Sequence, residues 1–458
     1  MPYLAWKSFD WRSDALPIFD AIRNKDNVFF LDSSRRGGYS GRYSFLGFEP
    51  FYILKSKQEP GAFSRVRELL ERFKLNNIKQ GFPFLGGAVG YFSYDSGLCL
   101  EKIRKAAIDD LELPDLFLGF YDCVIAIDHR KKKLAIFSSG FPEKSYLLAK
   151  KKAESRLKRF IGQLSGVKAA PGYREYALTK GKVKLSSNFT RKKYLQAVTI
   201  AKDYIKKGDI YQVNLSQRFF SKYNKSAFNL YKRLRHVSPS EFSSYLDCGD
   251  FQILSSSPER FLYFDGRKVS TRPMKGTRPR GISPQGDLRH KRALLKSAKD
   301  KAELVMIVDL LRNDLGRVCK YGSVKVNSMR TLEAYSTVYQ TTASIEGILH
   351  RDKDRIDLLK ACFPGGSITG CPKIRSMQII EELEPTSRSI YTGSLGYLSF
   401  HNTMDLNILI RTVVKKDDTI YFQVGGGIVA DSQAESEFEE TLVKARGIVR
   451  AIESENLS

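Results

Sequence analysis

The chain has 458 residues, 42% of them hydrophobic, and it is long enough to bury a sizeable core. It carries 76 Lys and Arg against 50 Asp and Glu, and this formal charge of +26 attracts anions such as nucleic acid, acidic partners and carboxylate metabolites. The six cysteines form no CxxC motif and no run approaches a membrane span, which argues against a zinc site, a disulfide framework and a membrane partner. The composition predicts a soluble cytoplasmic protein.

The N-terminal part alternates short apolar runs with turns. Helices are predicted at residues 65–73 and, as a basic amphipathic helix better explained by a solvated face than by nucleic-acid binding, at 142–164. Strands are predicted at residues 28–31, 43–46, 84–91, 121–128 and 134–138. Because strands follow one another with few helices between them, the pattern favours an antiparallel sheet over repeated βαβ units.

A Gly, Ser and Lys-rich segment at residues 166–189 predicts a linker. Thr190 can then cap a helix running to Lys207, and Gly208 can close it. The following run DIYQVNLSQRFF, residues 209–220, predicts a strand with a polar row on one face. Such a row usually faces solvent, although its apolar neighbours would also allow it to line a cavity.

The stretch SSSPERFLYFDGRKVSTRPMKGTRPRG, residues 255–281, predicts a β-hairpin with a tight DG turn. The return strand ends at Pro273, which cannot donate to a ladder. A two-residue turn would place Glu259 opposite Arg272 and within reach of Lys275. The hairpin would thus join a candidate proton carrier to a candidate nucleophile, and a plain surface ion pair is the competing interpretation.

Two pairs of acids recur at helical spacing. Asp300 and Glu303 lie three apart in a helix predicted over residues 291–316, and Glu437 and Glu440 repeat the spacing at the start of the predicted C-terminal helix. Acids in a first helical turn commonly complement the helix dipole. Two such pairs in a basic chain would also make the hard, all-oxygen site that Mg²⁺ accepts.

Two glycine-rich loops complete the pattern. GGSITG, residues 365–370, precedes a predicted helix over 372–383 whose first backbone amides can bind an anion. It is no Walker A loop, because Cys-Pro follows it. Three glycines at 425–427 come after a predicted strand at 420–424 and would allow a ligand to approach the backbone.

Several segments, taken in order, resemble the chorismate-utilising enzymes, and most closely component I of the aminodeoxychorismate (para-aminobenzoate) synthases. They are DIYQVNLSQRF, SSSPERFL, RPMKGTRPRG, KAELVMIVDLLRNDLGRV, FPGGSITGCPKIRSMQIIEELEP, GSLGYLSF and GGGIVADS. The resemblance is strong over residues 190–450 and weaker before them. It implies an α+β fold of two orthogonal antiparallel sheets with helices packed outside.

The same resemblance implies an organisation of the chain. Residues 1–165 would supply the N-terminal part of the sheet sandwich, 166–189 a linker-like segment, and 190–458 the chorismate-binding catalytic region, all within one large structural domain.

Two positions separate the reactions of this family. Members that add water to chorismate carry a lysine base where this chain has Gln212; a neutral amide cannot deprotonate water, whereas ammonia is already nucleophilic. Anthranilate synthases have a small residue where this chain has Lys275. In the aminodeoxychorismate synthases that lysine is proposed to attack C2 of chorismate and expel the C4 hydroxyl, before ammonia adds at C4. Glu259 would be the general acid, Thr277 would orient the ring, and the lysine should have a lowered pKa.

The resemblance assigns the remaining roles. Glu303 and Glu440 would coordinate Mg²⁺, while Asp300 and Glu437 would hold its waters. The groups expected to bind substrate are Tyr391, Arg411, Gly426, Gly427, Lys444, Ser367 and Thr369. Ser33 and Pro239 lie in segments that build a tryptophan pocket in relatives, so they mark a candidate pocket here. Gln340 stands where relatives usually have a histidine facing the ring.

The expected activity is amination of chorismate to 4-amino-4-deoxychorismate, which leads towards 4-aminobenzoate and folate. No glutaminase segment is recognised, so a separate glutamine amidotransferase (glutaminase) subunit is the expected partner. Anthranilate synthase component I is the first alternative, and isochorismate or salicylate synthase is disfavoured by Gln212. A nucleic-acid-binding protein would rest on charge alone, because no recognition motif is evident and no specific nucleic acid is expected.

Overall fold

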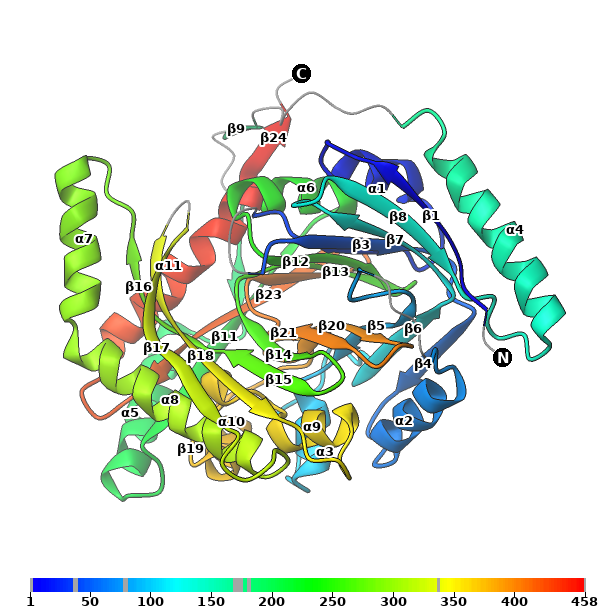
Figure 1. The fold of residues 1–458 in the computed structure, drawn as a ribbon. Helices are drawn as coiled ribbons and strands as arrows, with labels where there is room; N and C mark the ends of the chain where they lie inside the picture. Colours follow the sequence, from blue (N-terminus) through cyan, green and yellow to red (C-terminus); the bar gives the residue numbers. More distant parts are fainter. Residues whose placement is uncertain are drawn as a thin grey trace.

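Two antiparallel β-sheets stack on each other, with helices on their outer sides, in the computed structural model of the protein (Figure 1). The structure describes residues 3–35, 40–76, 81–167, 176–178, 183–335 and 338–456. Each strand pair of the two sheets in these residues is antiparallel, as the run of strands near the N-terminus predicted. The α+β class with two antiparallel sheets is therefore confirmed.

The first sheet takes strands from both halves of the chain. Among the described residues it runs in the order β1-β8-β7-β3-β2-β12-β13-β22-β23-β11-β10, with β19 paired to β11. The strands are β1 (Ala5–Asp10), β2 (Phe29–Asp32), β3 (Tyr43–Gly47), β7 (Cys123–Asp128), β8 (Lys133–Ser138), β10 (Ser186–Ser187), β11 (Gln212–Lys222), β12 (Phe242–Asp247), β13 (Phe251–Ser257), β19 (Gly370–Cys371), β22 (Thr412–Lys416) and β23 (Thr419–Ile428). The two halves meet where Phe30 pairs with Tyr245.

The second sheet is also shared between the halves. Its order in the described part is β16-β18-β15-β14-β21-β20-β5-β6-β4, with β17 paired to β18. The strands are β4 (Tyr52–Ser56), β5 (Gly87–Phe92), β6 (Leu116–Tyr121), β14 (Arg260–Phe264), β15 (Lys268–Arg272), β16 (Met274–Pro279), β17 (Lys325–Ala334), β18 (Val338–Ile348), β20 (Ser394–Ser399) and β21 (Met404–Asn407). A small separate pair joins β9 (Tyr176–Leu178) to β24 (Ser454–Asn456).

Helices cover the outer faces of both sheets. Those of the described residues are α1 (Leu16–Ile22), α2 (Ala62–Arg72), α3 (Asp95–Leu100), α4 (Tyr146–Leu164), α5 (Arg191–Lys206), α6 (Ala227–Val237), α7 (Pro284–Lys296), α8 (Ala298–Gly316), α9 (Arg355–Cys362), α10 (Lys373–Leu383) and α11 (Ala434–Glu453), with a 3₁₀ turn η1 (Gly366–Ile368). α4, α6 and α11 pack on the first sheet, and α8 packs on β16, β17 and β18 of the second. None of the helices in this part of the chain combines the length and apolar character needed to cross a membrane.

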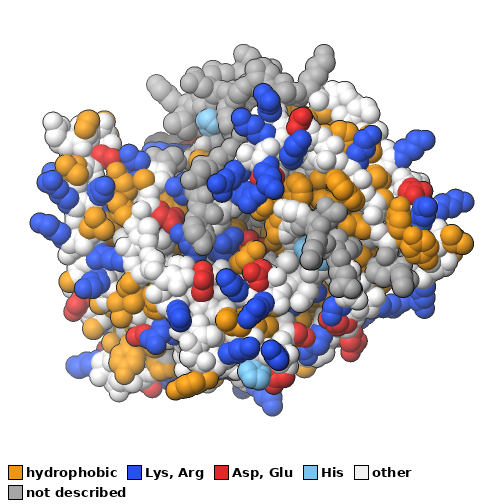
Figure 2. Space-filling model, viewed as in Figure 1, with side chains coloured by type: hydrophobic (Ala, Val, Ile, Leu, Met, Phe, Trp, Pro, Cys, Tyr) orange, Lys and Arg blue, Asp and Glu red, His pale blue; other side chains and the backbone are white. Residues whose placement is uncertain are grey.

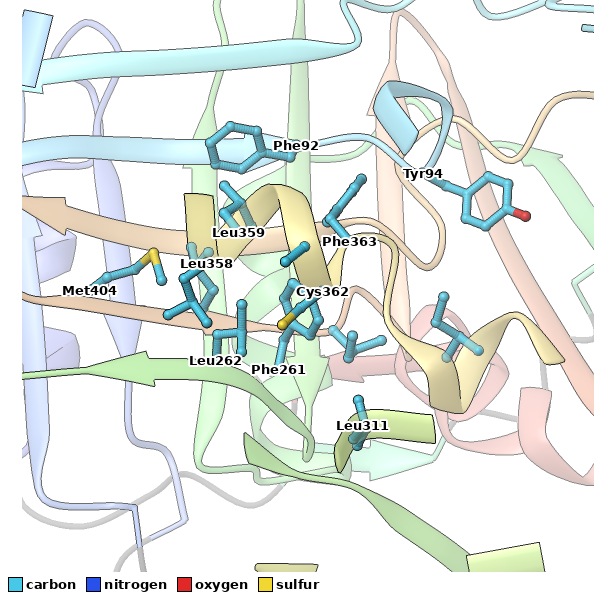
Figure 3. Packing of buried hydrophobic residues seen from close by; sticks show 14 of the residues in the cluster. Phe92, Tyr94, Phe261, Leu262, Leu311, Leu358, Leu359, Cys362, Phe363 and Met404 are labelled. Carbon is cyan, nitrogen blue, oxygen red and sulfur yellow. The ribbon is translucent and has the colours of Figure 1, made fainter. Parts of the chain in front are cut away.

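The hydrophobic core lies in three layers that follow this arrangement. The middle layer fills the space between the sheets, where Phe29 and Val124 of the first meet Val89 and Phe117 of the second. Figure 3 shows part of another layer, beneath the second sheet, in which Phe363 packs against Phe261 with ring centroids 6.0 Å apart. Full burial of a side chain of this size stabilises the fold by about 1.5–3 kcal/mol, so these layers fix the strands that carry the polar residues.

Most predicted elements are confirmed to within a few residues. α2, α4 and α5 match predicted helices, and Thr190 caps α5 by accepting a hydrogen bond from the Lys193 amide. β11 starts three residues later than predicted. Of the predicted linker, residues 168–175 and 179–182 lie outside the described residues.

Three local predictions are wrong, and one predicted helix starts a residue late. The helix predicted over 291–316 is two helices, because extended backbone at Ser297 ends α7 and its hydroxyl caps α8 by accepting from the Asp300 amide. The hairpin turn is longer than two residues, so Phe264 pairs with Val269. β23 does not stop before the three glycines but runs through them to Ile428 in register with β11. α10 starts at Lys373, with Pro372 as its N-cap.

Candidate active site

Glu259 immediately precedes β14 and is a buried carboxyl. Its Oε1 accepts a 2.6 Å hydrogen bond from the Ser367 hydroxyl of η1. Burial raises the pKa of Glu259 to about 7, against the opposing effects of that hydroxyl, Lys275 and the Met274 amide. A carboxyl with such a pKa can both give and take a proton near neutral pH.

The longer turn also changes which residue faces Glu259. Arg272 pairs with Arg260 across the hairpin, with a register irregularity beside it, and its guanidinium bonds to Glu333 instead. The predicted Glu259–Arg272 opposition is therefore wrong. The predicted approach of Glu259 and Lys275 is supported electrostatically, because Glu259 acts on the pKa of the lysine amine.

Lys275 lies on β16, which packs against α8. Burial lowers the pKa of Lys275, and the Lys444 ammonium acts in the same direction. Three carboxylates oppose this effect; they are Glu303 of α8, Glu259 and Glu440 of α11. One amine thus lies within electrostatic reach of acids and a base that are far apart in the sequence, and its lowered pKa agrees with the sequence prediction.

Gln212 opens β11 and is fully buried, with 0% of its surface exposed. Neither its Oε1 nor its Nε2 has a hydrogen-bond partner among the described residues. A Cβ at Gly427, on the neighbouring strand β23, would lie 2.5 Å from the Gln212 Nε2, so only glycine leaves room for the amide. Buried side-chain amides normally have hydrogen-bond partners. The amide of Gln212 is therefore available to hydrogen-bond a ligand.

The two acid pairs begin helices α8 and α11. Glu440 Oε1 is 2.7 Å from Lys444 Nζ, which also donates to the Gly425 carbonyl, and Asp300 is 2.9 Å from an Arg278 guanidinium nitrogen. Glu437 accepts a 2.6 Å hydrogen bond from Ser432. Glu437 belongs to the buried face of α11.

The carboxylates suit a hard cation in donor chemistry. Within the described residues, however, no group of three or more His, Cys, Asp or Glu side chains meets closely enough to hold a metal ion in this arrangement. Two of the four acids are engaged by basic side chains, Glu440 by Lys444 and Asp300 by Arg278. The residues present therefore fit Mg²⁺ chemically, and these two ion pairs compete with it.

The remaining predicted groups of the site lie on β16, on β23 and in the glycine loop around η1. Thr277 of β16 accepts a 3.2 Å hydrogen bond from the Gln340 amide of β18, whose oxygen is buried without a partner among the described residues. Thr369 donates to the carbonyl oxygens of Gly365 and Gly366, so its hydroxyl holds the glycine loop rather than standing free. A Cβ at Gly426 would lie 3.2 Å from a Glu437 oxygen.

Arg411 is half-buried and precedes β22 in a left-handed backbone conformation, with φ of 51°. Its guanidinium makes no hydrogen bond or ion pair within the described part of the chain. Burial lowers the pKa of Arg411. The phenol of Tyr391 is also buried, and burial raises its pKa. A desolvated, unpaired guanidinium is a strong receptor for a carboxylate.

A buried ion pair that the sequence reasoning missed holds β11 in place. Glu384 and Arg388 follow α10 and lie 2.7 Å apart, and Glu384 accepts hydrogen bonds from both the amide and the hydroxyl of Ser216. Arg388 donates to the Asn214 carbonyl. The i, i+4 spacing of these two residues was the sequence feature that could have predicted their ion pair. The pair explains why the polar row of β11 is buried rather than solvated.

A cavity of about 190 Å³ lies between the two sheets, lined in part by residues of β2 and β3. Ser33 lines it together with Glu241, Arg260 and Tyr397. Pro239, the other predicted member, is not part of the lining. Binding of tryptophan in this cavity stays a prediction.

Comparisons with known proteins bear on this site. The family model described as chorismate binding enzyme matches residues 27–450. The chain is 43% identical to anthranilate synthase component 1 of Thermus thermophilus, covering 94% of each chain, and 40% identical to aminodeoxychorismate synthase component 1 of Escherichia coli, covering 97% of each. Among solved structures it resembles anthranilate synthase component I of Streptococcus pneumoniae, with a TM-score of 0.78 at 31% identity over 89% of this chain and 92% of that one.

Proposed function

Because the chain belongs to the chorismate-binding enzyme family, we propose that it acts as component I of an aminodeoxychorismate synthase and aminates chorismate at C4. Relatives of similar identity carry the names of both this enzyme and anthranilate synthase, so overall similarity does not separate the two reactions. The choice rests on individual residues.

The observation that carries the proposal is Lys275. The Lys275 amine belongs to the candidate active site, and burial lowers its pKa. Glu259, whose pKa is about 7, belongs to the same site. A lysine that is partly neutral can act as a nucleophile, and a carboxyl that is partly protonated can act as an acid. The lowered pKa of Lys275 and the raised pKa of Glu259 both change in the direction that covalent amination requires.

In the proposed reaction the Lys275 nitrogen forms a bond to C2 of chorismate. The ring double bonds shift, the C4–O bond breaks, and Glu259 gives its proton to the leaving hydroxyl, which departs as water. Ammonia then forms the C4–N bond, the double bonds shift back, and the bond between C2 and the lysine nitrogen breaks. A proton from the new ammonium group returns to Glu259, so the net change is replacement of hydroxyl by amine.

Gln212 would exclude the competing addition of water. Its amide cannot take a proton from water, but its free oxygen can accept a hydrogen bond from ammonia and hold it close to the ring. The absence of a hydrogen-bond partner for either amide atom among the described residues supports this role. A separate glutaminase subunit would supply the ammonia.

The carboxylates of α8 and α11 would hold Mg²⁺, with Glu303 and Glu440 as direct ligands and Asp300 and Glu437 bonded to its waters. When bound, the ion supplies positive charge that neutralises the ring carboxylate of chorismate. Lys444 would share in that neutralisation once it leaves Glu440. Arg411, together with Tyr391, would hold the enolpyruvyl carboxylate through its unpaired guanidinium.

Product analysis tests the proposal. The purified chain is incubated with chorismate, Mg²⁺ and ammonium, with and without an added aminodeoxychorismate lyase. We expect 4-aminobenzoate and pyruvate to form only when the lyase is present. Fluorescent anthranilate and pyruvate without the lyase would identify anthranilate synthase instead, and turnover without ammonium would identify isochorismate or salicylate synthase.

A further inference from the structure

Arg388 carries a charge that lies inside the protein rather than on its surface. Lys and Arg side chains are spread over the face of the molecule that Figure 2 shows, whereas Arg388 and its partner Glu384 are each 2% exposed. All five N–H groups of the guanidinium donate hydrogen bonds: two to the Glu384 carboxylate, two to the carbonyls of Ile368 and Asn214, and one to the Thr392 hydroxyl. A lysine could not make this set, because its ammonium is a point charge without the planar fork.

The first segment that Arg388 holds is the glycine loop. One guanidinium nitrogen donates to the Ile368 carbonyl at 2.9 Å. Ile368 stands between Ser367 and Thr369, two groups expected to bind substrate, and the Ser367 hydroxyl donates to the Glu259 carboxyl at 2.6 Å. The position of the guanidinium therefore sets where the loop presents its hydroxyl to the candidate general acid.

The second segment is the start of β11. Another Arg388 nitrogen donates to the Asn214 carbonyl at 2.7 Å, and the Asn214 amide donates to the Thr369 carbonyl at 2.7 Å. Asn214 lies two residues after Gln212, so the guanidinium bonds to the strand that carries the amide expected to hold ammonia. The loop and the strand are thus bonded to each other and to the same side chain.

The third segment carries Tyr391. The guanidinium carbon of Arg388 lies 5.7 Å from the centre of the Tyr391 ring and 4.8 Å from that of the Tyr94 ring. Figure 3 shows the Tyr94 ring pointing away from Phe363 and the rest of the labelled cluster. Both distances are within the range at which a cation is attracted to an aromatic face. The charge therefore also holds Tyr391, an expected substrate group.

We propose that Arg388 is a positioning residue for the reaction, an inference that rests on the proposed function above. Through one guanidinium it aligns the loop of Ser367, the strand of Gln212 and the ring of Tyr391, so that chorismate and ammonia are bound next to each other. Arg388 itself touches no substrate, because its five donors are taken. Glu384 fixes the guanidinium in turn, since its carboxylate is also bonded to β11.

Arg388→Lys tests this role, because it keeps the positive charge but loses the planar fork of donors. Arg235→Lys is the matched control. Arg235 is likewise 2% exposed, and it pairs with Asp14 and Asp32, which belong to no segment of the candidate active site. Circular dichroism selects a temperature at which the proteins are folded. Initial rates with chorismate, Mg²⁺ and ammonium give kcat and KM, and calorimetry without ammonium gives the Kd for chorismate.

We expect Arg388→Lys to lower kcat/KM for both chorismate and ammonium at least about tenfold, since a small misplacement of binding groups can cost about 100-fold. Chorismate binding should weaken, and the alkaline limb of the pH profile of kcat/KM should move to higher pH. Burial raises the pKa of Glu259, whereas the Ser367 hydrogen bond, Lys275 and the Met274 amide lower it, and a displaced loop would weaken that hydrogen bond. A variant that merely destabilised the fold would not move this limb.

The control should leave the rates, the pH profile and chorismate binding unchanged. An unchanged kcat/KM in Arg388→Lys would overturn the inference, and so would equal losses in the control. If Arg388→Lys does not fold, Glu384→Gln takes its place, because it keeps the volume and an acceptor oxygen. Failure of both variants to fold while the control folds would also overturn the inference, since the pair would then serve the fold alone. Chorismate binding is measured whichever product forms, so failure of the proposed reaction is recognised separately.

Discussion

The buried carboxyl of Glu259 should make the protein less stable as the pH rises. Its pKa is about 7 in the folded chain against an ordinary value of 4.5. Because the folded value lies above the unfolded one, the carboxyl contributes its full stability below pH 4.5 and loses it as the pH rises through 7. At 1.36 kcal/mol per pH unit the whole loss is about 3 kcal/mol, of which about 2 kcal/mol falls between pH 5.5 and 8.

Glu259→Gln isolates this effect. The amide cannot ionise, yet its oxygen can still accept the hydrogen bond from Ser367, so the local packing is kept. Urea unfolding of both proteins, followed by circular dichroism at pH 5.5 and pH 8, should show the variant gaining about 2 kcal/mol of unfolding free energy relative to the unmodified chain as the pH is raised. Amination should fall by about 10²–10⁴-fold, since the general acid is lost. Equal pH dependence of unfolding in the two proteins would refute the burial argument.

Four further outcomes follow from the site. Lys275→Ala should abolish amination of chorismate, or slow it at least about 10³-fold; a product assay showing an unchanged rate would remove the covalent step. Gly427→Ala should push its methyl into the Gln212 amide and reduce ammonium-dependent turnover, while circular dichroism shows a folded chain; full activity would show that the amide has room to move. Arg411→Lys should raise the KM for chorismate about tenfold with a smaller change in kcat, because the two-pronged contact is lost; steady-state kinetics decide, and an unchanged KM would exclude the contact. Removal of divalent cations with EDTA should stop turnover, and Mg²⁺ should restore it in the unmodified chain but not in Glu440→Gln; activity that survives EDTA would exclude the ion.

Residue spacing predicted the positions of helices and strands better than it predicted which of their residues contact each other. The strand run at β11 and the helix from Thr190 were readable because alternation and capping are local properties. The break at Ser297 was missed, because a serine inside a helical pattern is equally compatible with a continuous helix. Its hydroxyl caps a new helix by accepting from the Asp300 amide, and this arrangement is favoured only once α8 packs on the second sheet. The hairpin register was missed because Asp265 accepts from the amides of Arg267 and Lys268 and so widens the turn.

The candidate site was predictable as a set of residues but not as a set of pairings. The Glu440–Lys444 ion pair follows from i, i+4 spacing within α11, whereas nothing local to Asp300 indicates that Arg278 engages it, because that ion pair depends on how α8 meets the second sheet. The burial of the polar row on β11 likewise depends on Glu384, which lies far along the chain, just after α10. Long-range neighbours of this kind fix side-chain environment, and the sequence alone does not contain them in readable form.

The pairing of β2 with β12 has a consequence for synthesis of the chain. During translation β3 can pair with one edge of β2 at once, but the other edge, at residues 29–32, has no native partner until residues 243–246 leave the ribosome. An apolar strand edge is a template for wrong pairing with other nascent chains. Expression at low temperature or with a holding chaperone should therefore raise the yield of native enzyme more than any change to the mature surface.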